Sequence, residues 1–367
     1  MPGGENERDE LRILLLSRYG RLAASSRVRS YQYLPYLRNL GLVVESKPLF
    51  TDRYIERLYR GRPRHALPIL AGYASRLWHL ATSSRFDLLW IEYELFPWLP
   101  AWFELLLAKL GVPYVVDYDD AIFHRYDSHR NPLVRRFLGR KIDRVMRGAS
   151  LVIAGNDYLA EHARRAGASR VERVPTVVDL TRYQVTTPAA DRTYTVGWIG
   201  SPLTAPYLQL VRDALAEVYS EGSVRIRLVG AGPVSLDHVA VDVRPWSEST
   251  EVAELQSFDV GIMPLRDEAW ERGKCGYKLI QYMACARAVV ASPVGASKEI
   301  VEHGTNGFLA DAAPEWVVAL RALRDPALRT RMGAAGRAKV EQAYCVQVTA
   351  PRLASLLRSA ARKKRAS

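Results

Sequence analysis

Short, wholly apolar runs alternate with longer amphipathic runs along most of the chain, and this alternation constrains the fold more than any other feature. In the first half, the apolar runs predict strands at residues 11–16, 42–50, 87–91, 113–116 and 150–154. Apolar residues at helical spacing predict helices at residues 27–40, 98–110, 133–146 and 158–165. Strands that are apolar on both faces and alternate with helices are typical of a parallel sheet that helices cover.

The alternation breaks once, at residues 181–193, where the polar sequence TRYQVTTPAADRT has no apolar period and predicts a linker. It then restarts, with strands predicted at 194–199, 224–229, 239–243, 260–263 and 288–291 and helices at 206–219, 251–256 and 277–284. A chain of 367 residues is long enough for two domains. We therefore expect two similar α/β domains, at residues 10–185 and 192–345. Ligands of such sheets bind beyond the carboxyl ends of the strands, so the residues that follow each strand are the candidates for a site.

The chain has an excess of basic residues, with 52 Lys and Arg against 39 Asp and Glu and a formal net charge of +13. This charge points to an anionic partner, which is a phosphorylated substrate, an acidic membrane surface or a nucleic acid. Nucleic-acid binding would explain the charge but not the two predicted sheets, so we expect no nucleic-acid partner.

Three further features concern the compartment. The three cysteines, an odd number with no Cys-x-x-Cys spacing, argue against a disulfide framework or a zinc cage and fit a reducing cytoplasm. Residues 1–10 are polar and acidic and lack the pattern of a signal peptide. The most apolar stretch, residues 86–116, is broken by charged residues and prolines, so it predicts no membrane span. We expect a cytoplasmic protein.

The strongest local signal for a site lies within residues 261–301. There a predicted strand ends at Pro264, a polar loop passes through Gly273 and Gly276, and a helix begins near Tyr277. The free N–H groups and the positive dipole end of a helix start favour a phosphate, and Gly276 would let the backbone approach it closely. Three cations surround the same point, namely Arg272, Lys274 and Lys278. Chemistry alone leaves a second interpretation equally open, a plain glycine-containing loop with solvated lysines.

A wider set of residues in and around this segment matches one family pattern. The matching residues are Tyr282, Met283 and Ala284, the strand 288–291, Gly295, Glu299, Ile300, Val301, Gly304, Asn306, Gly307 and Phe308. Two flanking segments also match, VRIRLVGAGP at residues 224–233 and RVERVPTVVDL at residues 170–180. The segment resembles the nucleotide-sugar site of the glycosyltransferase family 4 enzymes, and its Lys-Cys-Gly-Tyr-Lys-Leu-Ile-Gln run is similar to that of one subgroup. The resemblance covers most of residues 194–344 well and the first half more loosely.

The resemblance implies both a fold and an activity. The fold is the GT-B architecture, two facing Rossmann-like domains with parallel sheets and a deep interdomain cleft, in which a C-terminal helix at residues 347–362 completes the first domain. The activity is that of a retaining hexosyltransferase, which moves a sugar from a nucleotide sugar to a glycan or lipid-linked acceptor in the synthesis of a cell-surface polysaccharide or glycoconjugate. Because the nucleotide sugar is a substrate, the resemblance implies no cofactor, and such enzymes usually need no metal.

The sequence departs from the family pattern at both glutamates of the donor site. Gln281 stands where the second glutamate, which binds the ribose hydroxyls, usually sits, and an amide can still donate and accept hydrogen bonds there. Gly273 stands where the first glutamate contacts the sugar, and we expect Glu271 to substitute for it from the same loop.

The other donor-site expectations also come from the resemblance. The family's phosphate-binding Arg and Lys after the strand 194–199 are missing, and this chain has Gly200, Ser201 and Thr204 there instead. The groups expected to hold the diphosphate are therefore Arg272, Lys274, Gly276, Tyr277 and Lys278. Trp246, next to Ser247, is the candidate for contact with the base.

Candidates on the acceptor side lie in the first half. The loop after the strand 11–16 has one glycine, Gly20, and then Arg27, where the family has a Gly-Gly pair that lines the acceptor side. Arg27 is a candidate for a phosphate contact, although a surface arginine is the commoner explanation. Asp119, Asp120 and His124 follow a predicted strand and are expected to bind or orient the acceptor, with helix capping by the aspartates as the alternative.

Other functions remain open at this point. A nucleotide-sugar epimerase or hydrolase shares the architecture, and the missing glutamates would fit a catalytically inactive nucleotide-sugar-binding homologue. A dinucleotide oxidoreductase would need Gly-x-Gly-x-x-Gly after the first strand, and the sequence there lacks it.

The predicted helix 98–110 is rich in aromatic residues, among them Trp98, Trp102 and Phe103. An amphipathic helix of this kind on a basic protein could rest on an anionic bilayer as a peripheral contact. We expect instead that these side chains pack in the core against the sheet.

Overall fold

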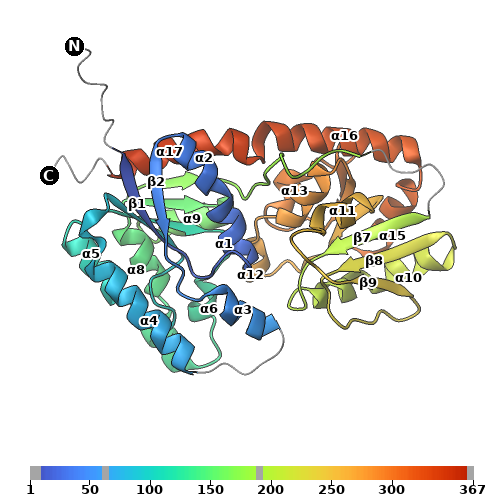
Figure 1. The fold of residues 1–367 in the computed structure, drawn as a ribbon. Coiled ribbons are helices and arrows are strands. Elements are labelled where there is room, and N and C mark those ends of the chain that lie inside the picture. Colours follow the sequence, from blue (N-terminus) through green and yellow to red (C-terminus); the bar gives the residue numbers. More distant parts are fainter. Residues whose placement is uncertain (1–9, 60–65, 187–192, 362–367) are drawn as a thin grey trace, which may run out of the picture. The chain divides into compact units, whose positions relative to one another are not determined.

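The computed structural model describes residues 10–59, 66–186 and 193–361, and its contacts divide the chain into two compact units (Figure 1). The first unit is Met1–Thr176 with Thr349–Ser367, and the second is Val177–Val348. Residues 187–192 of the predicted linker, residues 1–9 and the last residue of the predicted helix 347–362 lie outside the described residues. No helix in the described part of the chain is both long and apolar enough to cross a membrane.

The first unit contains one six-stranded, fully parallel sheet, as the alternating pattern predicts. Its strands are β1 (Leu11–Leu16), β2 (Leu42–Ser46), β3 (Leu88–Glu92), β4 (Tyr114–Tyr118), β5 (Leu151–Ala154) and β6 (Val171–Arg173). The spatial order is β2-β1-β3-β4-β5-β6, so the chain reverses its direction of growth between β1 and β3. The sequence does not predict β6, because this short edge strand is polar and only partly buried.

Helices surround this sheet. They are α1 (Ala24–Arg29), α2 (Leu34–Asn39), α3 (Asp52–Tyr59), α4 (Ala66–Ala81), α5 (Trp102–Lys109), α6 (His124–Asp127), α7 (Pro132–Leu138), α8 (Lys141–Gly148) and α9 (Asp157–Arg165). Two predicted helices are each divided in the structure. The predicted helix 27–40 is interrupted by a 3-10 turn, Tyr31–Tyr33, and the predicted helix 133–146 is divided between α7 and α8.

The final helix, α17 (Val346–Ala361), contributes its residues from Thr349 onward to the first unit. The Thr349 and Tyr33 hydroxyls lie 2.8 Å apart, and the Arg170 guanidinium donates to the Ser359 hydroxyl at 2.7 Å. The first unit is thus built from two segments that are far apart in the sequence.

The second unit repeats the architecture with a second six-stranded parallel sheet. Its strands are β7 (Tyr194–Ile199), β8 (Val224–Val229), β9 (Val241–Arg244), β10 (Val260–Met263), β11 (Ala288–Ala291) and β12 (Gly307–Leu309). The order β12-β11-β10-β7-β8-β9 places the reversal between β7 and β10. The helices are η3 (Ala205–Val211, a 3-10 helix), α10 (Arg212–Ser220), α11 (Glu251–Gln256), α12 (Ala269–Arg272), α13 (Tyr277–Ala284), α14 (Ser297–Ile300), α15 (Ala313–Ala322) and α16 (Pro326–Ala343).

Two glycines in the strands let helix α13 and its neighbours approach this sheet. A Cβ on Gly261 of β10 would lie 2.3 Å from the Tyr282 ring, and one on Gly197 of β7 would lie 2.0 Å from the Phe258 ring. The Tyr282 hydroxyl in turn accepts a hydrogen bond from the backbone N–H of Ile199 at 3.0 Å. The position of α13 against the end of β7 therefore depends on the absence of a side chain at Gly261.

The aromatic segment before α5 corrects one expectation. The helix begins at Trp102 rather than at Trp98, and the two indoles are 48% and 64% exposed, so neither packs in the core. Phe103 does pack inward, with its ring centroid 4.7 Å from that of Phe96. Helical periodicity locates an apolar stripe, but it does not reveal whether another element covers that stripe.

The role of Gly261 can be tested by a single methyl group. We expect Gly261→Ala to lower the free energy of unfolding by about 1–3 kcal/mol, because the added Cβ must displace the Tyr282 ring. Urea denaturation followed by circular dichroism measures this change. Val318→Ala on an exposed helix face is the control and should change stability by less than about 0.5 kcal/mol. A Gly261→Ala midpoint equal to that of the wild type would contradict the packing argument.

Candidate functional site

The loops at the carboxyl end of the second sheet come together at its reversal point, where ligands of parallel α/β sheets bind. Gly200 follows β7, Gly230 follows β8 and Trp246 follows β9. A Cβ on Gly230, which has a φ of +75°, would lie 2.5 Å from the Gly200 carbonyl oxygen and 3.0 Å from the Trp246 Cβ. These three loops are thus in contact with one another.

Helix α13 begins at the same edge of the sheet. Its N-cap residue, Gly276, has a φ of +67°, and a Cβ there would lie 2.4 Å from the Cδ1 atom of Ile300. Glycine is therefore required at this position by backbone conformation and by packing. No side chain caps the helix, so its positive dipole end is left for another anionic or acceptor group.

Lys278, in the first turn of α13, reaches the end of β7. Its Nζ atom lies 4.1 Å from the centroid of the Trp198 ring, 3.4 Å from the Thr204 hydroxyl and 2.8 Å from where a Cβ on Gly200 would be. Within residues 10–59, 66–186 and 193–361 this lysine takes part in no ion pair. Burial, with a further contribution from Lys274, lowers the pKa of Lys278 to about 7. An anion bound beside Nζ would restore its charge.

The other two cations of the predicted phosphate site lie differently. The Arg272 Nε donates to Asp267 at 2.7 Å, and this pair is half exposed. Lys274 lies with its Nζ 5.7 Å from the centroid of the Trp270 ring. Lys278 is therefore the predicted cation that the structure places against the loop after β7.

Glu271 is a buried carboxylate on the short helix α12 and is only 6% exposed. Its Oε1 atom accepts a hydrogen bond from the Tyr207 hydroxyl, which comes from η3. Its Oε2 atom is buried and has no hydrogen-bond partner among the described residues. Buried polar atoms of native proteins are almost always paired, so this oxygen points to a donor supplied by a ligand, such as a hydroxyl group.

A chain of hydrogen bonds links Gln281 to Trp246. The Gln281 amide donates to the Tyr183 hydroxyl at 3.0 Å, and that hydroxyl donates to Glu251 Oε1 at 3.0 Å. The Trp246 indole N–H donates to Glu251 Oε2 at 2.9 Å, which fixes the orientation of its partly exposed ring. Gln281 is only 3% exposed, so contact with a ribose stays a prediction for this residue.

Sequence reasoning did not single out Tyr183, Tyr207 and Glu251, although each holds a candidate residue in place. Tyr183 lies in the segment predicted as a linker, and burial raises its pKa well above the usual value. Glu251 begins a predicted helix, where a glutamate is ordinary. Nothing in the local pattern distinguishes these residues, because their partners come from other loops.

The acceptor-side candidates gather at the carboxyl end of the first sheet. The Tyr93 hydroxyl donates to Asp119, and the two ring nitrogens of His124 lie 2.9 Å from Asp127 and 2.8 Å from the Tyr158 hydroxyl. The N-cap residue of α6, the helix that follows Asp119 and Asp120, is Phe123 rather than either aspartate.

Gly20 and Arg27 have structural contacts in the first unit. A Cβ on Gly20 would lie 2.3 Å from the Asp52 Oδ1 atom, which accepts a hydrogen bond from the Leu22 N–H at 3.0 Å. Arg27 is buried, so the explanation of this residue as a surface arginine is wrong.

Domain models match both units. Residues 16–177 match the model described as "Glycosyl transferase 4-like domain", and residues 193–325 match the model described as "Glycosyl transferases group 1".

Curated relatives match over shorter segments. The chain is 27% identical over 148 residues to N-acetyl-alpha-D-glucosaminyl L-malate synthase of Bacillus anthracis, and 29% identical over 139 residues to D-inositol 3-phosphate glycosyltransferase of Pseudarthrobacter chlorophenolicus. These two alignments each cover 37% of this chain, and they cover 38% and 32% of the two relatives, respectively. A third relative is the GDP-mannose-dependent monoacylated alpha-(1-6)-phosphatidylinositol monomannoside mannosyltransferase of Corynebacterium glutamicum, to which this chain is 26% identical over 216 residues. That alignment covers 51% of this chain and 56% of the relative.

Solved structures share the fold over nearly the whole chain. Sucrose-phosphate synthase from Thermosynechococcus elongatus has a TM-score of 0.71 at 16% identity, covering 95% of this chain and 98% of that one. HepE from Anabaena, solved with UDP and with UDP-glucose, has a TM-score of 0.66 at 18–19% identity and covers 95% of this chain and 100% of that one. The chain therefore has the GT-B fold, with a match to a glycosyltransferase domain model in each of its two parallel α/β units.

Proposed function

We propose that the protein is a glycosyltransferase that moves a sugar from a nucleotide sugar, held by the second unit, to an acceptor bound by the first. The observation that carries this proposal is a pair of groups at one sheet edge that lack partners among the described residues. Lys278 has no counter-ion there, and one buried carboxylate oxygen of Glu271 has no donor. A nucleotide sugar supplies both missing partners, a diphosphate and sugar hydroxyls. The solved HepE complexes with UDP and UDP-glucose support this choice of ligand.

The diphosphate would lie against the start of α13. Lys278 and Lys274 would face its charge, and Gly276 and Tyr277 would bring the helix dipole to it. Gly200 and Ser201 would contribute from the loop after β7, and Arg272 would approach if it leaves Asp267. When the sugar–phosphate bond breaks, negative charge develops on the leaving phosphate, and fixed positive groups stabilise that charge as it forms. The proposal involves no resident metal or cofactor.

The two ends of the donor have separate contacts in this proposal. Glu271 Oε2 accepts a hydrogen bond from a sugar hydroxyl, while Tyr207 holds the other oxygen of the same carboxylate. The fixed indole of Trp246 offers a flat face for the nucleobase, and Gln281 is the candidate for the ribose.

On the acceptor side, Asp119, Asp120 and His124 would orient a hydroxyl group, with Gly20 and Arg27 lining the same loops. We propose transfer with retention, in which the leaving phosphate itself takes the proton from the acceptor hydroxyl. The acceptor would be a glycan or a lipid-linked molecule of a cell-surface polysaccharide or glycoconjugate pathway in the cytoplasm. The relatives reported above are named as transferases or synthases, and they do not favour an epimerase or hydrolase.

A peripheral contact with an anionic membrane belongs to the same proposal. Helices α4, α5 and α7 expose large apolar side chains, which are Leu67, Leu70, Leu77, Trp78, Trp102, Leu105, Leu106, Leu133 and Phe137. The exposed charged residues described on these helices are basic, Lys109, Arg135 and Arg136, and the one acidic residue of α5, Glu104, is buried. Exposed tryptophan and leucine beside lysine and arginine suit an anionic lipid surface.

The donor assignment predicts a pH dependence that comes from Lys278. Its pKa of about 7 means that Lys278 loses its charge above neutral pH in the free protein, and binding must then return a proton to it. A thermal-shift screen of UDP, GDP, ADP and their sugars first identifies the nucleotide that binds. Calorimetry should then show its affinity falling up to tenfold between pH 7.5 and 8.5, with net proton uptake.

Two substitutions test whether nucleotide binding depends on Lys278 itself or only on the overall positive charge of the protein. Lys278→Met should weaken binding at pH 7 at least tenfold and abolish the pH dependence, whereas Lys298→Met, at an exposed lysine, should leave both unchanged. Equal nucleotide affinity in Lys278→Met and the wild type would contradict the donor assignment.

The membrane contact predicts salt-sensitive binding to lipid. The protein should co-sediment with vesicles of phosphatidylglycerol and phosphatidylcholine at low salt and dissociate at high salt. The double variant Trp78→Ser and Trp102→Ser should bind about tenfold more weakly, because two exposed indoles lose their apolar contact. Val318→Ser, an exposed apolar residue of the second unit, is the control. Failure of the wild type to bind at low salt would remove the membrane contact from the proposal.

A further inference from the structure

Two arginines lie at the carboxyl edge of the first sheet, where the chain order reverses between β1 and β3. Arg18 follows β1, and Arg125 lies on α6 beside Tyr126. We propose that Arg18 and Arg125 together bind a phosphate group carried by the acceptor. This inference deepens the proposed function, because it names the chemical class of the acceptor.

Arg18 is a buried arginine whose side chain donates no hydrogen bond to any residue that the structure describes. It is only 6% exposed, and its guanidinium lies against the rings of Tyr19 and Tyr93, at 5.8 and 5.9 Å from their centroids. Its nearest ion-pair contact, to Glu94 Oε1, is 3.6 Å long, which exceeds hydrogen-bond length. Its Nε atom is buried with no hydrogen-bond partner in the described part of the chain. A guanidinium held in this way has N–H groups ready for an external oxyanion.

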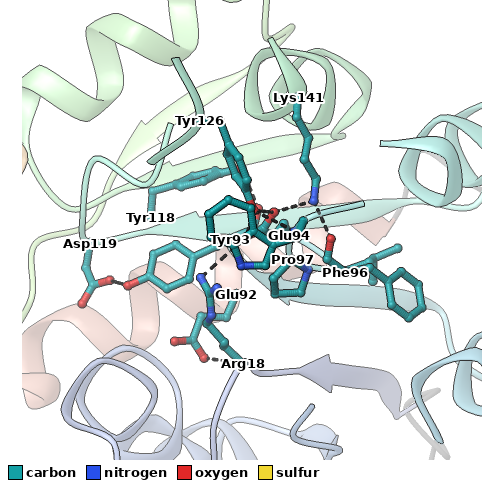
Figure 2. A network of polar contacts seen from close by, with 12 residues as sticks. Arg18, Glu92, Tyr93, Glu94, Phe96, Pro97, Tyr118, Asp119, Tyr126 and Lys141 are labelled. Atoms are coloured by element: carbon teal, nitrogen blue, oxygen red, sulfur yellow. Dashed lines mark hydrogen bonds and ion pairs between the residues drawn. The ribbon is translucent and has the colours of Figure 1, made fainter. Parts of the chain in front are cut away.

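Glu94 pairs with Arg18 only at 3.6 Å, because two other groups also bind this carboxylate (Figure 2). The Lys141 Nζ lies 2.5 Å from Glu94 Oε2, and the Tyr126 hydroxyl donates to the two carboxylate oxygens at 2.9 and 2.8 Å. Lys141 also donates to the Phe96 carbonyl at 2.5 Å. Glu94 is therefore shared between Lys141 and Arg18, so that this one carboxylate faces two buried cations.

Glu92 does not supply a second full negative charge. It accepts hydrogen bonds from the Arg18 backbone N–H at 2.9 Å and from the Ser26 hydroxyl at 2.7 and 3.0 Å. Burial raises the pKa of Glu92 to about 7, so this carboxyl is partly protonated at neutral pH.

Arg125 provides the second cation. Its side chain is half-buried and takes part in no hydrogen bond or ion pair with any residue that the structure describes. Burial and the nearby charge of Arg18 both lower the pKa of Arg125. The hydroxyl of its neighbour Tyr126 donates a hydrogen bond to Glu94, the carboxylate that also contacts Arg18, so α6 is held close to Arg18. Arg18 shares a single carboxylate with Lys141, and Arg125 has no ion pair among the described residues. Two guanidinium groups that repel each other in such a setting match a ligand with two negative charges.

The backbone beside Arg18 supports a binding role. Tyr93, whose ring faces the Arg18 guanidinium, has a φ of +63°, which is rare for an aromatic residue. Its hydroxyl is fixed by a hydrogen bond to Asp119, one of the acceptor-side candidates (Figure 2). Left-handed backbone of this kind concentrates at ligand sites. A phosphate monoester is a dianion near neutral pH, and its tetrahedral oxygens suit paired guanidinium groups.

The test uses inorganic phosphate as the probe and the full chain carrying Lys278→Met, so that the donor site does not contribute. In this background, phosphate should raise the melting temperature with a saturating dose dependence, and adding Arg125→Gln should weaken the apparent affinity at least tenfold. Arg125→Lys should retain part of the affinity, and Arg130→Gln, at an exposed arginine five residues away, should retain all of it.

A second readout distinguishes binding from a structural role. Without phosphate, Arg125→Gln should leave the melting temperature unchanged or raise it, because the variant removes a repulsive charge beside Arg18. A fall in melting temperature, or equal phosphate affinity in Arg125→Gln and Arg130→Gln, would overturn the proposal. Absence of any phosphate effect, or equally strong stabilisation by acetate, would also overturn it.

The outcome is separable from that of the donor assignment. If no nucleotide binds the wild type while phosphate binding still depends on Arg125, the donor site is wrong and the phosphate site in the first unit stands. If Lys278 controls nucleotide binding but Arg125 has no effect on phosphate, the acceptor inference alone fails.

Discussion

Within each of the two sheets, all the described strands run parallel to one another, and the placement of the polar side chains depends on this constraint. The strand faces are covered by helices, so a charged side chain has room mainly where strands end. In the second unit, the loops after β7, β8 and β9 are therefore brought into contact, and α13 starts beside them. In the first unit, the same geometry brings Arg18, in the loop after β1, to Tyr93 and Glu94 after β3.

The charges at these edges fall into two kinds. Arg29 is satisfied, because it bonds to Asp117 at 2.6 Å and to the Val174 carbonyl at 2.9 Å, and Lys141 is satisfied by Glu94. Lys278 and Arg125 have no comparable counter-ion in the described parts of the chain. Burying an ion without a partner is costly, whereas an anionic ligand that binds only the folded state offsets that cost. Satisfied pairs hold the fold together, and unsatisfied cations at the strand ends indicate where anions bind.

Much of the architecture could be predicted from the sequence, since long apolar runs reveal buried strands directly. The bounds of β1, β7 and β8 agree with the predicted ones, and the parallel α/β arrangement is confirmed. Short edge strands such as β6 were missed, because a three-residue polar strand has no detectable period. The exposure of Trp98 and Trp102 was wrongly predicted for a different reason. An apolar stripe has the same spacing whether a neighbouring element covers it or leaves it open.

By itself, the sequence determined the alternation of apolar and amphipathic runs and the glycines that α13 and the strands require. It also indicated the loop around Gly276 as the main candidate for a ligand site. Local patterns suffice there, because each depends on residues close together in the chain. Only the tertiary structure decided which charges have partners. It joined Tyr207 to Glu271 across 64 positions and Tyr183 to Gln281 across 98, and it left Lys278 and Arg18 without full compensation. Whether a buried charge is satisfied depends on atoms brought together by folding, and no local pattern contains that information.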